Sequence, residues 1–401
     1  MGERRTFGVF LGAVLMLGIA DSLSSPYLAL FAADEAGLDP LRVGALASAS
    51  GLSGIVISAW LGRRFDRAPR RIYAVFACVG GALGYALLTV SRSFEVLLLL
   101  SLSLLGVVAV AFPQLFALAQ VSLGKTPQAR RAAPVLRSGW SLAWALGPLV
   151  GALVMTRSGF VGVFWATAGT LLVTALLLLF VPVRRFAAGA VTGEQSKRAP
   201  LSWGTTALLV LGVMLFFTSM LAGSLVLPFY VTRELDLPAA SLGPLFSACA
   251  AVEVVVALAL AFLPTWKWLV PGGMLLMVGY FAITMVSRDL TGLLLAQVAR
   301  GAAIAVVGAA GIVYFQEWMA PATGRATTLF SNATTAGVVI AGLLAGFWLE
   351  AFSYRTALAL CALTALLGAV AFAGAGTRPD VRLRPAADVP ASVLSAEDAE
   401  G

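Results

Sequence analysis

Twelve apolar stretches, each about as long as a membrane is thick, follow one another along the chain, and short loops separate them. An apolar run of about 20 residues crosses the hydrocarbon core of a bilayer as a helix, and runs of this length are too long for the strands of a membrane barrel. The chain is therefore expected to be an all-α integral membrane protein with twelve transmembrane helices. We place them at residues 7–32, 41–62, 71–90, 94–120, 132–156, 159–181, 203–231, 241–263, 268–286, 290–316, 325–351 and 355–375.

The composition excludes a water-soluble enzyme, because 60% of the residues are hydrophobic and only 11% are charged. An intramembrane hydrolase would need paired aspartates on helices or a zinc-binding histidine motif, and the chain contains no histidine. No glycine-rich phosphate loop is visible, so an ion gradient is the expected source of energy. We expect no enzymatic activity, no cofactor and no metal site.

The basic residues predict the orientation in the membrane. The 27 Lys and Arg residues are concentrated in alternate loops, on the side that also holds Met1. Because cytoplasmic loops carry an excess of Lys and Arg, both termini are expected in the cytoplasm. Much of the net charge of +8 then faces anionic lipid, so membrane lipid is an expected partner and nucleic acid is not.

The chain is expected to consist of two similar halves. The segment from Asp21 to Tyr27 in the first half resembles the segment from Gly223 to Phe229 in the second, with a proline followed by an aromatic residue in both. Two six-helix bundles related by an axis along the membrane normal are typical of transporters that rock around a central site, and a channel is disfavoured because no ring of pore-lining charges is present. The predicted parts are an N-terminal bundle (1–182), a cytoplasmic linker (183–202), a C-terminal bundle (203–376) and a disordered cytoplasmic tail (377–401).

The residues from Gly62 to Arg71 resemble the signature of the major facilitator superfamily, which lies between the second and third helices. A glycine there lets two helices approach closely, and an acidic side chain can contact basic groups and a helix N-terminus. Such contacts would hold an outward-facing state. The alternative is an ordinary basic loop on the cytoplasmic side. The resemblance implies a conformational latch made of Gly62, Asp66, Arg67, Arg70 and Arg71.

Three further blocks resemble the bacterial sugar efflux transporters within that superfamily: Pro113 to Ala119, Leu136 to Pro148, and Tyr314 to Asn332. They keep their order over nearly the whole chain. The resemblance implies the major facilitator fold, with two pseudo-symmetric six-helix bundles, in a monomer of the bacterial cytoplasmic (inner) membrane. It also implies export of a sugar or glycoside in exchange for protons.

The chain departs from that family at three positions, since it carries Gly139 in place of a glutamine, Asp21 in place of a glycine and Glu317 in place of an aspartate. The lost amide and the added carboxylate leave the substrate open. A multidrug/proton antiporter of the same fold is therefore the main alternative, and a receptor or scaffold on a transporter fold is a third.

The fifth helix contains Gly147, Pro148 and Gly151, which resemble part of the antiporter motif of the superfamily. Proline removes a backbone hydrogen bond and bends a helix, and glycines allow tight packing. The motif favours export, although an ordinary packing kink would give the same residues.

Ionisable residues inside the spans are costly in lipid, so they indicate functional positions. Because the chain lacks histidine, proton coupling requires a carboxylate, and Asp21 and Glu253 are the candidates. Glu253 and Arg300 lie at similar depth in helices 8 and 10, which is compatible with a salt bridge. The alternative for Glu253 is a permanently paired group that only stabilises helix packing.

Sugar recognition needs polar groups for the hydroxyls and aromatic faces for the ring, which leads to eight candidate substrate-binding residues. Among them Arg137 and Asn332 occupy corresponding places in helices 5 and 11, so they are expected to face each other across a central cavity. Tryptophans in membrane helices also serve as packing or interfacial anchors, which is the alternative for the aromatic members. The candidates are Arg137, Asn332, Gln114, Gln316, Trp140, Trp144, Tyr27 and Tyr314.

Overall fold

The structure is a computed structural model in which residues 3–123, 127–181, 203–260, 262, 268–319 and 323–375 are described. The segments predicted as the linker (183–202) and the tail (377–401), and the side chain of Asp66, lie outside the described residues. The first half contains α1 (Glu3–Ser24), α2 (Leu28–Asp34), α3 (Pro40–Arg67), α4 (Ile72–Leu88), α5 (Phe94–Leu100), η1 (Ser101–Leu105), α6 (Gly106–Leu123) and α7 (Pro127–Leu179). The second half contains α8 (Trp203–Phe229), η2 (Tyr230–Glu234), η3 (Ala239–Ser241), α9 (Leu242–Leu260), α10 (Leu269–Val286), α11 (Leu290–Ala305), η4 (Val306–Ala310), α12 (Gly311–Trp318), α13 (Thr323–Ala351) and α14 (Tyr354–Gly374).

The described helices confirm an all-helical membrane protein with twelve crossings. Ten helical stretches of the described part are long and apolar enough to span a membrane. One of them, Val135–Leu179, is 45 residues long and turns back at Gly159, where φ is +61°, so it accounts for two crossings. The shorter apolar helix α4, of 17 residues, supplies the remaining crossing.

The helix boundaries differ from the prediction in two places that matter for the site. The first span is not continuous, because α1 ends at Ser24 and α2 begins at Leu28. Pro26 lies in this interruption, and proline has no N–H group to continue the helical hydrogen bonds. The second difference is that α3 continues to Arg67, whereas the predicted span ends at Gly62, so Arg67 lies on the helix and not in a loop.

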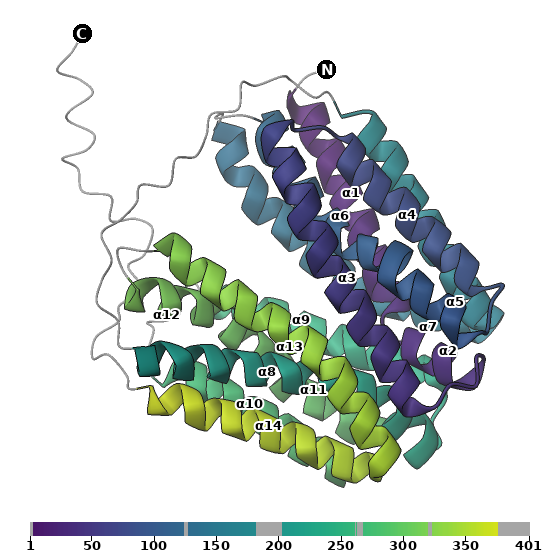
Figure 1. Cartoon of the computed structure of the whole chain (residues 1–401), viewed down its shortest axis with the longest axis vertical. Helices are drawn as coiled ribbons and strands as arrows, with labels where there is room; N and C mark the ends of the chain where they lie inside the picture. Colours follow the sequence, from purple (N-terminus) through teal and green to yellow (C-terminus); the bar gives the residue numbers. More distant parts are fainter. Residues whose placement is uncertain are drawn as a thin grey trace.

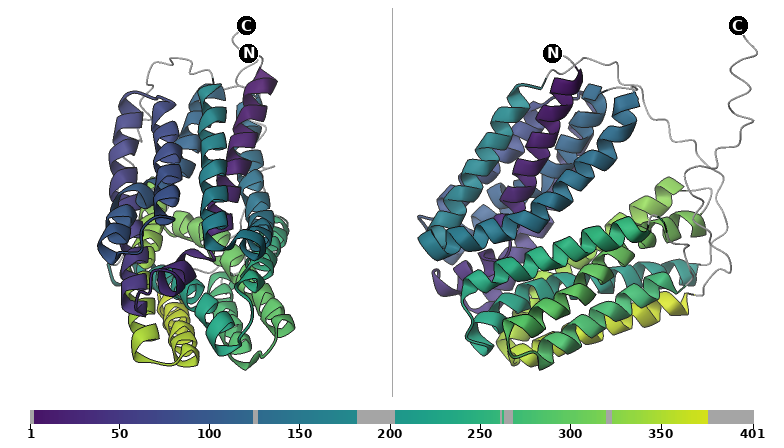
Figure 2. Two further views of the ribbon diagram at one scale, coloured as in Figure 1. Left: turned by 90° about the vertical axis from the view of Figure 1, so that its right-hand side faces the viewer. Right: turned by 180° about the vertical axis from the view of Figure 1, so that it is seen from behind.

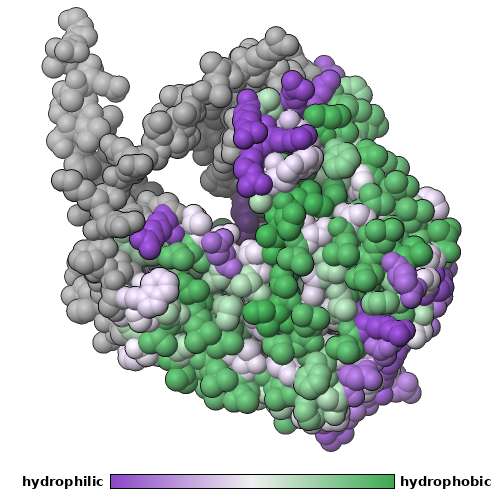
Figure 3. All heavy atoms as spheres, in the orientation of Figure 1, coloured by the Kyte–Doolittle hydropathy of each residue, from purple (hydrophilic) through white to green (hydrophobic). Residues whose placement is uncertain are grey.

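The helices form two bundles that meet at one end and diverge at the other, as the two arms of a V (Figures 1 and 2). Helices α1 to α7 form one bundle and helices α8 to α14 form the other. The diverging end, called the open end below, is where α1 begins and α14 ends. Figure 3 shows a surface that is hollowed between the bundles at this end, and a broad apolar surface elsewhere.

Glycines bring the two bundles into contact at the opposite, closed end. A Cβ atom added to Gly44 of α3 would lie 2.8 Å from the Cα atom of Gly346 in α13. On the other side, a Cβ atom on Gly243 of α9 would collide with the backbone oxygen of Pro148 in α7. Backbones of different helices approach this closely only where side chains are absent.

A matching irregularity supports the internal repeat. The fourth crossing, α5–η1–α6, contains the five-residue π-helical turn η1, and the tenth crossing, α11–η4–α12, contains the five-residue π-helical turn η4. π-Helical turns are rare and occur often at functional sites. Their presence in corresponding crossings is expected if the two bundles are structural repeats.

Candidate substrate and proton-coupling site

Arg137 and Asn332 lie on helices that border the interface between the bundles. Helix α7, which carries Arg137, packs against α9 of the second bundle, and α13, which carries Asn332, packs against α3 of the first. Both side chains are exposed, and both lie towards the open-end start of their helices. A guanidinium and an amide are therefore available to polar groups that enter from the open end.

An aromatic cluster lies beside Arg137. The ring of Phe112 in α6 has its centroid 4.4 Å from that of Trp140 and 4.4 Å from that of Phe116. The Arg137 guanidinium carbon lies 5.9 Å from the Phe112 ring centroid. Half-buried Trp140 also packs against Gly18 of α1. The cluster combines an aromatic surface with one cation, and the sequence alone had pointed to Trp140 but not to the two phenylalanines.

Asp21 is partly buried in α1, and the side chain of Trp144 in α7 is its hydrogen-bond partner. The carboxylate lines a cavity of about 300 Å³ inside the first bundle. The four ion pairs found among the described residues do not involve Asp21. This partly buried acid thus faces a cavity without a basic neighbour at ion-pair distance in the described part of the chain.

Arg300 is buried, with 4% of its surface exposed, and its contacts differ from those predicted. It donates hydrogen bonds to the Ser224 hydroxyl and, at 3.4 Å, to the side-chain oxygen of Gln297. Its guanidinium lies 5.0 Å from the Phe246 ring centroid and also over the ring of Tyr280.

The salt bridge considered between Glu253 and Arg300 is not among the ion pairs of the described residues. Glu253 instead interacts electrostatically with two arginines, Arg137 of the first bundle and Arg300 of its own. The carboxylate is half-buried in α9, so it is positioned to respond to charges on both sides of the interface.

The remaining candidates lie inside the bundles. Tyr27 is fully buried against Gly151, and Tyr314 is buried between Trp318 and Phe372, whose ring centroid lies 5.2 Å away. The structure thus places both tyrosines in helix packing.

Two amides also have defined surroundings. Gln114 is buried, and its side-chain oxygen has no hydrogen-bond partner among the described residues. Half-buried Gln316 of α12 donates to the Thr327 hydroxyl of α13 at 3.0 Å. Gln316 therefore joins two helices, and Gln114 retains an unused acceptor.

The arginines of the predicted latch lie at the open end, and their described contacts stay within the first bundle. Arg71 donates to the backbone oxygens of Leu179, at 2.6 Å, and Val181, at 3.1 Å. Arg67 and Arg70 are exposed, and a Cβ atom on Gly62 would meet no other atom within 4 Å. Among the described contacts of these arginines, none joins the two bundles, as the latch hypothesis requires for the opposite state.

The motif in the fifth crossing provides close packing. A Cβ atom on Gly147 would collide with the Ser22 side chain of α1, and one on Gly151 would lie 2.7 Å from the Leu23 backbone oxygen. Non-helical backbone angles occur in α7 only at Gly159, so the kink expected at Pro148 stays a prediction.

Close packing also accounts for Gly139, where a Cβ atom would lie 3.0 Å from a methyl carbon of Leu11. The glutamine that the family resemblance implies at this position would need more space between α1 and α7.

An ion pair at the closed end joins the two bundles and was not foreseen. Arg233, in η2, lies 2.6 Å from the carboxylate of Asp34, at the end of α2. Each is the second residue after a predicted span, Asp34 after the first and Arg233 after the seventh. This matching position is the sequence signal that points to the pair. Among the residues described, no group of three His, Cys, Asp or Glu side chains is arranged to hold a metal ion.

Comparisons with known proteins agree with this architecture. Residues 10–287 match the sequence family described as the Major Facilitator Superfamily, whose members are transporters and not enzymes. Among solved structures, the nucleoside transporter NupG aligns with a TM-score of 0.74 at 15% identity, covering 92% of this chain and 98% of that one. A bacterial homologue of the lysosomal transporter Spinster, in an inward-facing and unoccupied conformation, aligns with a TM-score of 0.71 at 13% identity, covering 94% of this chain and 99% of the other.

Three relatives are similar over most of their length. A Deinococcus radiodurans protein named as a sugar efflux transporter is 34% identical over 88% of this chain and 94% of its own. Sugar efflux transporter B of Salmonella typhimurium is 30% identical, with coverage of 87% and 90%, and sugar efflux transporter A of Escherichia coli K12 is 28% identical, with coverage of 86% and 90%. The chain therefore belongs to the major facilitator superfamily of multi-pass membrane transporters and, within it, to the bacterial sugar efflux transporters.

Proposed function

We propose that this protein exports sugars or sugar-like small molecules by alternating access, in exchange for protons. The observation that carries the proposal is the similarity to relatives named sugar efflux transporters, at 28% to 34% identity over at least 86% of the chain. The geometry at the interface between the bundles supports the proposal, because the polar side chains of Arg137 and Asn332 and an aromatic cluster lie on helices that border it.

The substrate is proposed to bind between α7 and α13. Arg137 and Asn332 would hydrogen-bond its hydroxyl groups from opposite bundles. The cluster of Phe112, Phe116 and Trp140 would face the apolar side of the sugar ring, as aromatic side chains do in small-molecule sites. Gln114, with its unused acceptor, is a further polar group on the same helix as Phe112.

The open end is proposed to face the cytoplasm, because Arg63, Arg64, Arg67, Arg70 and Arg71 gather there. The conformation is then inward-open, both termini are cytoplasmic, and the protein lies in the bacterial cytoplasmic membrane. The bundles 1–182 and 203–376 would pivot so that the cytoplasmic ends close and the outer ends separate. In that state the latch of Gly62, Asp66 and the nearby arginines would contact the second bundle.

Asp21 and Glu253 are proposed to bind the exchanged proton. Each is a carboxylate at membrane depth outside any described ion pair, and buried acids of this kind mark proton relays. Arg137 belongs to the first bundle and Arg300 to the second, so movement of the bundles would change the charge that this carboxylate faces.

A multidrug/proton antiporter is the second candidate, and one observation favours it. Apolar side chains make up most of the lining of the cavity beside Asp21, which suits a hydrophobic cation better than a sugar. Counterflow with purified protein in liposomes separates the two, using labelled lactose, labelled glucose and labelled tetraphenylphosphonium. Exchange of a sugar supports the proposal, and exchange of the cation alone contradicts it.

A further inference from the structure

The cavity beside Asp21 lies within the first bundle and reaches towards its outer end. Its walls come from α1 to α6, with one residue, Leu225, contributed by the second bundle. Asp21 lies in the middle of the first span, whereas Leu88 and Phe31 lie near the outer ends of α4 and α2. A water molecule takes about 30 Å³ of liquid volume, so about 300 Å³ has room for several.

Three serine side chains make part of the cavity wall polar. Ser25, Ser50 and Ser101 line it together with Asp21, and none of the three hydroxyls hydrogen-bonds another described residue. Ser101 is buried, Ser50 is half-buried and Ser25 is exposed, so the hydroxyls lie at different depths along the cavity wall. These groups are therefore suited to hold water, which needs two to four polar partners.

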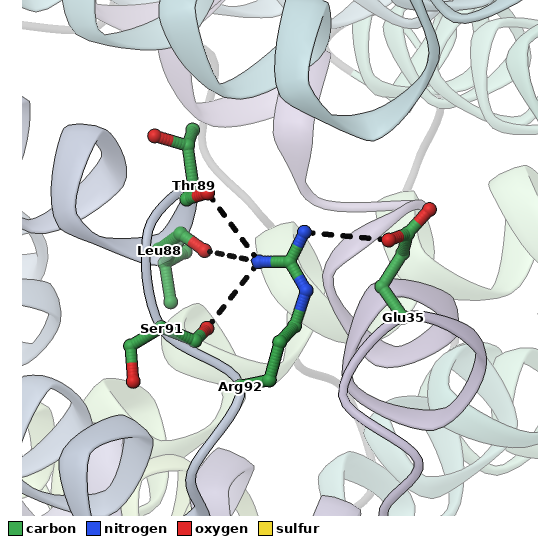
Figure 4. Close-up of polar contacts among 5 residues, drawn as sticks. All are labelled: Glu35, Leu88, Thr89, Ser91 and Arg92. Atoms are coloured by element: carbon green, nitrogen blue, oxygen red, sulfur yellow. Dashed lines mark hydrogen bonds and ion pairs between the residues drawn. The ribbon is translucent and has the colours of Figure 1, made fainter.

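Arg92 lies beside two residues of the cavity wall, Phe31 and Leu88, and Figure 4 shows its polar contacts. Its guanidinium lies 4.9 Å from the centroid of Phe31, a residue of the cavity wall, and donates at 3.1 Å to the backbone oxygen of Leu88, another wall residue. It also donates to the backbone oxygens of Thr89 and Ser91 and pairs with Glu35 at 3.3 Å. We call this arrangement of Arg92 and Glu35 the Arg92 plug.

The Arg92 plug borders the outer solution, since the side chains of Arg92 and Glu35 are 35% and 47% exposed. An ion pair with that exposure is weak, so it can break when its surroundings move. The contact between Arg92 and Glu35 can therefore be broken at low cost.

Helix α2 connects the plug to the movement of the bundles. It lines the cavity, and the interruption after Ser24 separates it from α1. Its last residue, Asp34, pairs with Arg233 of the second bundle, and the next residue, Glu35, pairs with Arg92. Separation of the outer ends must break the Asp34–Arg233 pair and release the segment that holds the plug.

We propose that this cavity is the route by which water and protons reach Asp21 from the outer side, and that the Arg92 plug opens it when the bundles separate at their outer ends. This inference rests on the proposed role of Asp21 in proton coupling. The groups that face Asp21 are Trp144 and Tyr85, and no basic side chain of the described residues is at ion-pair distance. A closed plug in the inward-open conformation prevents a continuous proton path across the membrane.

Cysteine accessibility tests the route without any transport measurement. Ser101→Cys places a thiol in the cavity wall, and the native Cys78, Cys249 and Cys361 are all buried. A membrane-impermeant cationic methanethiosulfonate is added to the outside of whole cells, and the labelling rate is measured in three backgrounds. These are Arg92→Ala, Arg233→Ala, and the control Arg355→Ala, which breaks an outer ion pair with Glu234 inside the second bundle.

Labelling from outside is expected to become up to about fivefold faster with Arg92→Ala and with Arg233→Ala, the factor set by one exposed ion pair, and to stay unchanged with Arg355→Ala. Equal labelling rates in all three backgrounds would overturn the inference. Faster labelling from the cytoplasmic side of inverted vesicles would also overturn it, because the cavity would then open to the hollow between the bundles and not to the outer side. Ala47→Cys on another wall serves as the reporter if Ser101→Cys fails to insert. The labelling measurement needs no substrate, so its result can be interpreted even if the protein does not transport sugar.

Discussion

Gly44 is the residue whose substitution should most directly shift the balance between the two conformations. It lies in α3 at the closed end, against Gly342 and Gly346 of α13. In Gly44→Ala the new methyl carbon would lie 2.8 Å from the Cα atom and 2.9 Å from the nitrogen of Gly346. Backbone atoms inside a helix cannot move aside, so the two helices must separate.

The size of the effect follows from the cost of overpacking. Inserting a methyl group into a tight contact costs about 1 to 3 kcal/mol. The cost applies only while α3 and α13 touch, as they do in this structure, which we propose to be the inward-open conformation. Since 1 to 3 kcal/mol corresponds to about a 5- to 150-fold change in an equilibrium constant, the inward-open population should fall by about that factor relative to the outward-open one.

Double electron–electron resonance can measure this shift. Spin labels replace Arg63 of α3 and Arg325 of α13, which are exposed and belong to different bundles. Gly44→Ala should increase the population with a short distance between the labels. Gly169→Ala is the matched control, because it also changes a helical glycine but meets no atom within 4 Å. Identical distance distributions in Gly44→Ala, the control and the parent protein would refute the reasoning.

Three further outcomes are expected. Asp21→Asn should abolish proton-driven export while the protein still inserts and exchanges sugar; transport against a gradient at the parent rate would remove Asp21 from the coupling role. Arg137→Ala should lower sugar counterflow by about tenfold or more, because a hydrogen bond to a charged group contributes about 1.5 to 3 kcal/mol. The control Tyr27→Phe should leave counterflow unchanged, because Tyr27 is buried in the helix packing. Equal counterflow in both variants would place the substrate elsewhere. Gly159→Ala should destabilise the protein by about 1 to 3 kcal/mol and lower the thermal unfolding midpoint, unlike Gly169→Ala, because φ is +61° and ψ is −163° at Gly159, a conformation that essentially only glycine adopts. An unchanged midpoint would argue against this backbone conformation at Gly159.

The fold could be predicted from the sequence because lipid imposes a strict length on each helix. Ten of the described stretches meet that requirement outright, and the ends of most predicted spans agree with the helices to within a few residues. Local exceptions were harder to foresee. The break after Ser24 depends on one proline, although Pro228 of the second bundle lies inside the continuous helix α8. Neighbouring helices therefore decide which proline interrupts a span.

The site could be predicted only in part, because depth along a helix does not fix the direction of a side chain. Arg137 and Asn332 lie on helices that border the interface, and their facing each other across a central cavity stays a prediction. Glu253 and Arg300 also match in depth, but Arg300 contacts Ser224 and Gln297 and makes no ion pair with Glu253. The rotation of each helix about its axis depends on packing, which a single sequence does not display.

Simultaneous recording of sugar and proton movement tests the central claim of sugar export in exchange for protons most directly. Purified protein is placed in liposomes loaded with labelled sugar and a pH-sensitive dye, and the sugar is allowed to leave down its gradient. Sugar efflux should acidify the liposome interior, and Asp21→Asn should prevent the acidification. Sugar efflux with no pH change, or with a rise in internal pH, would contradict proton exchange.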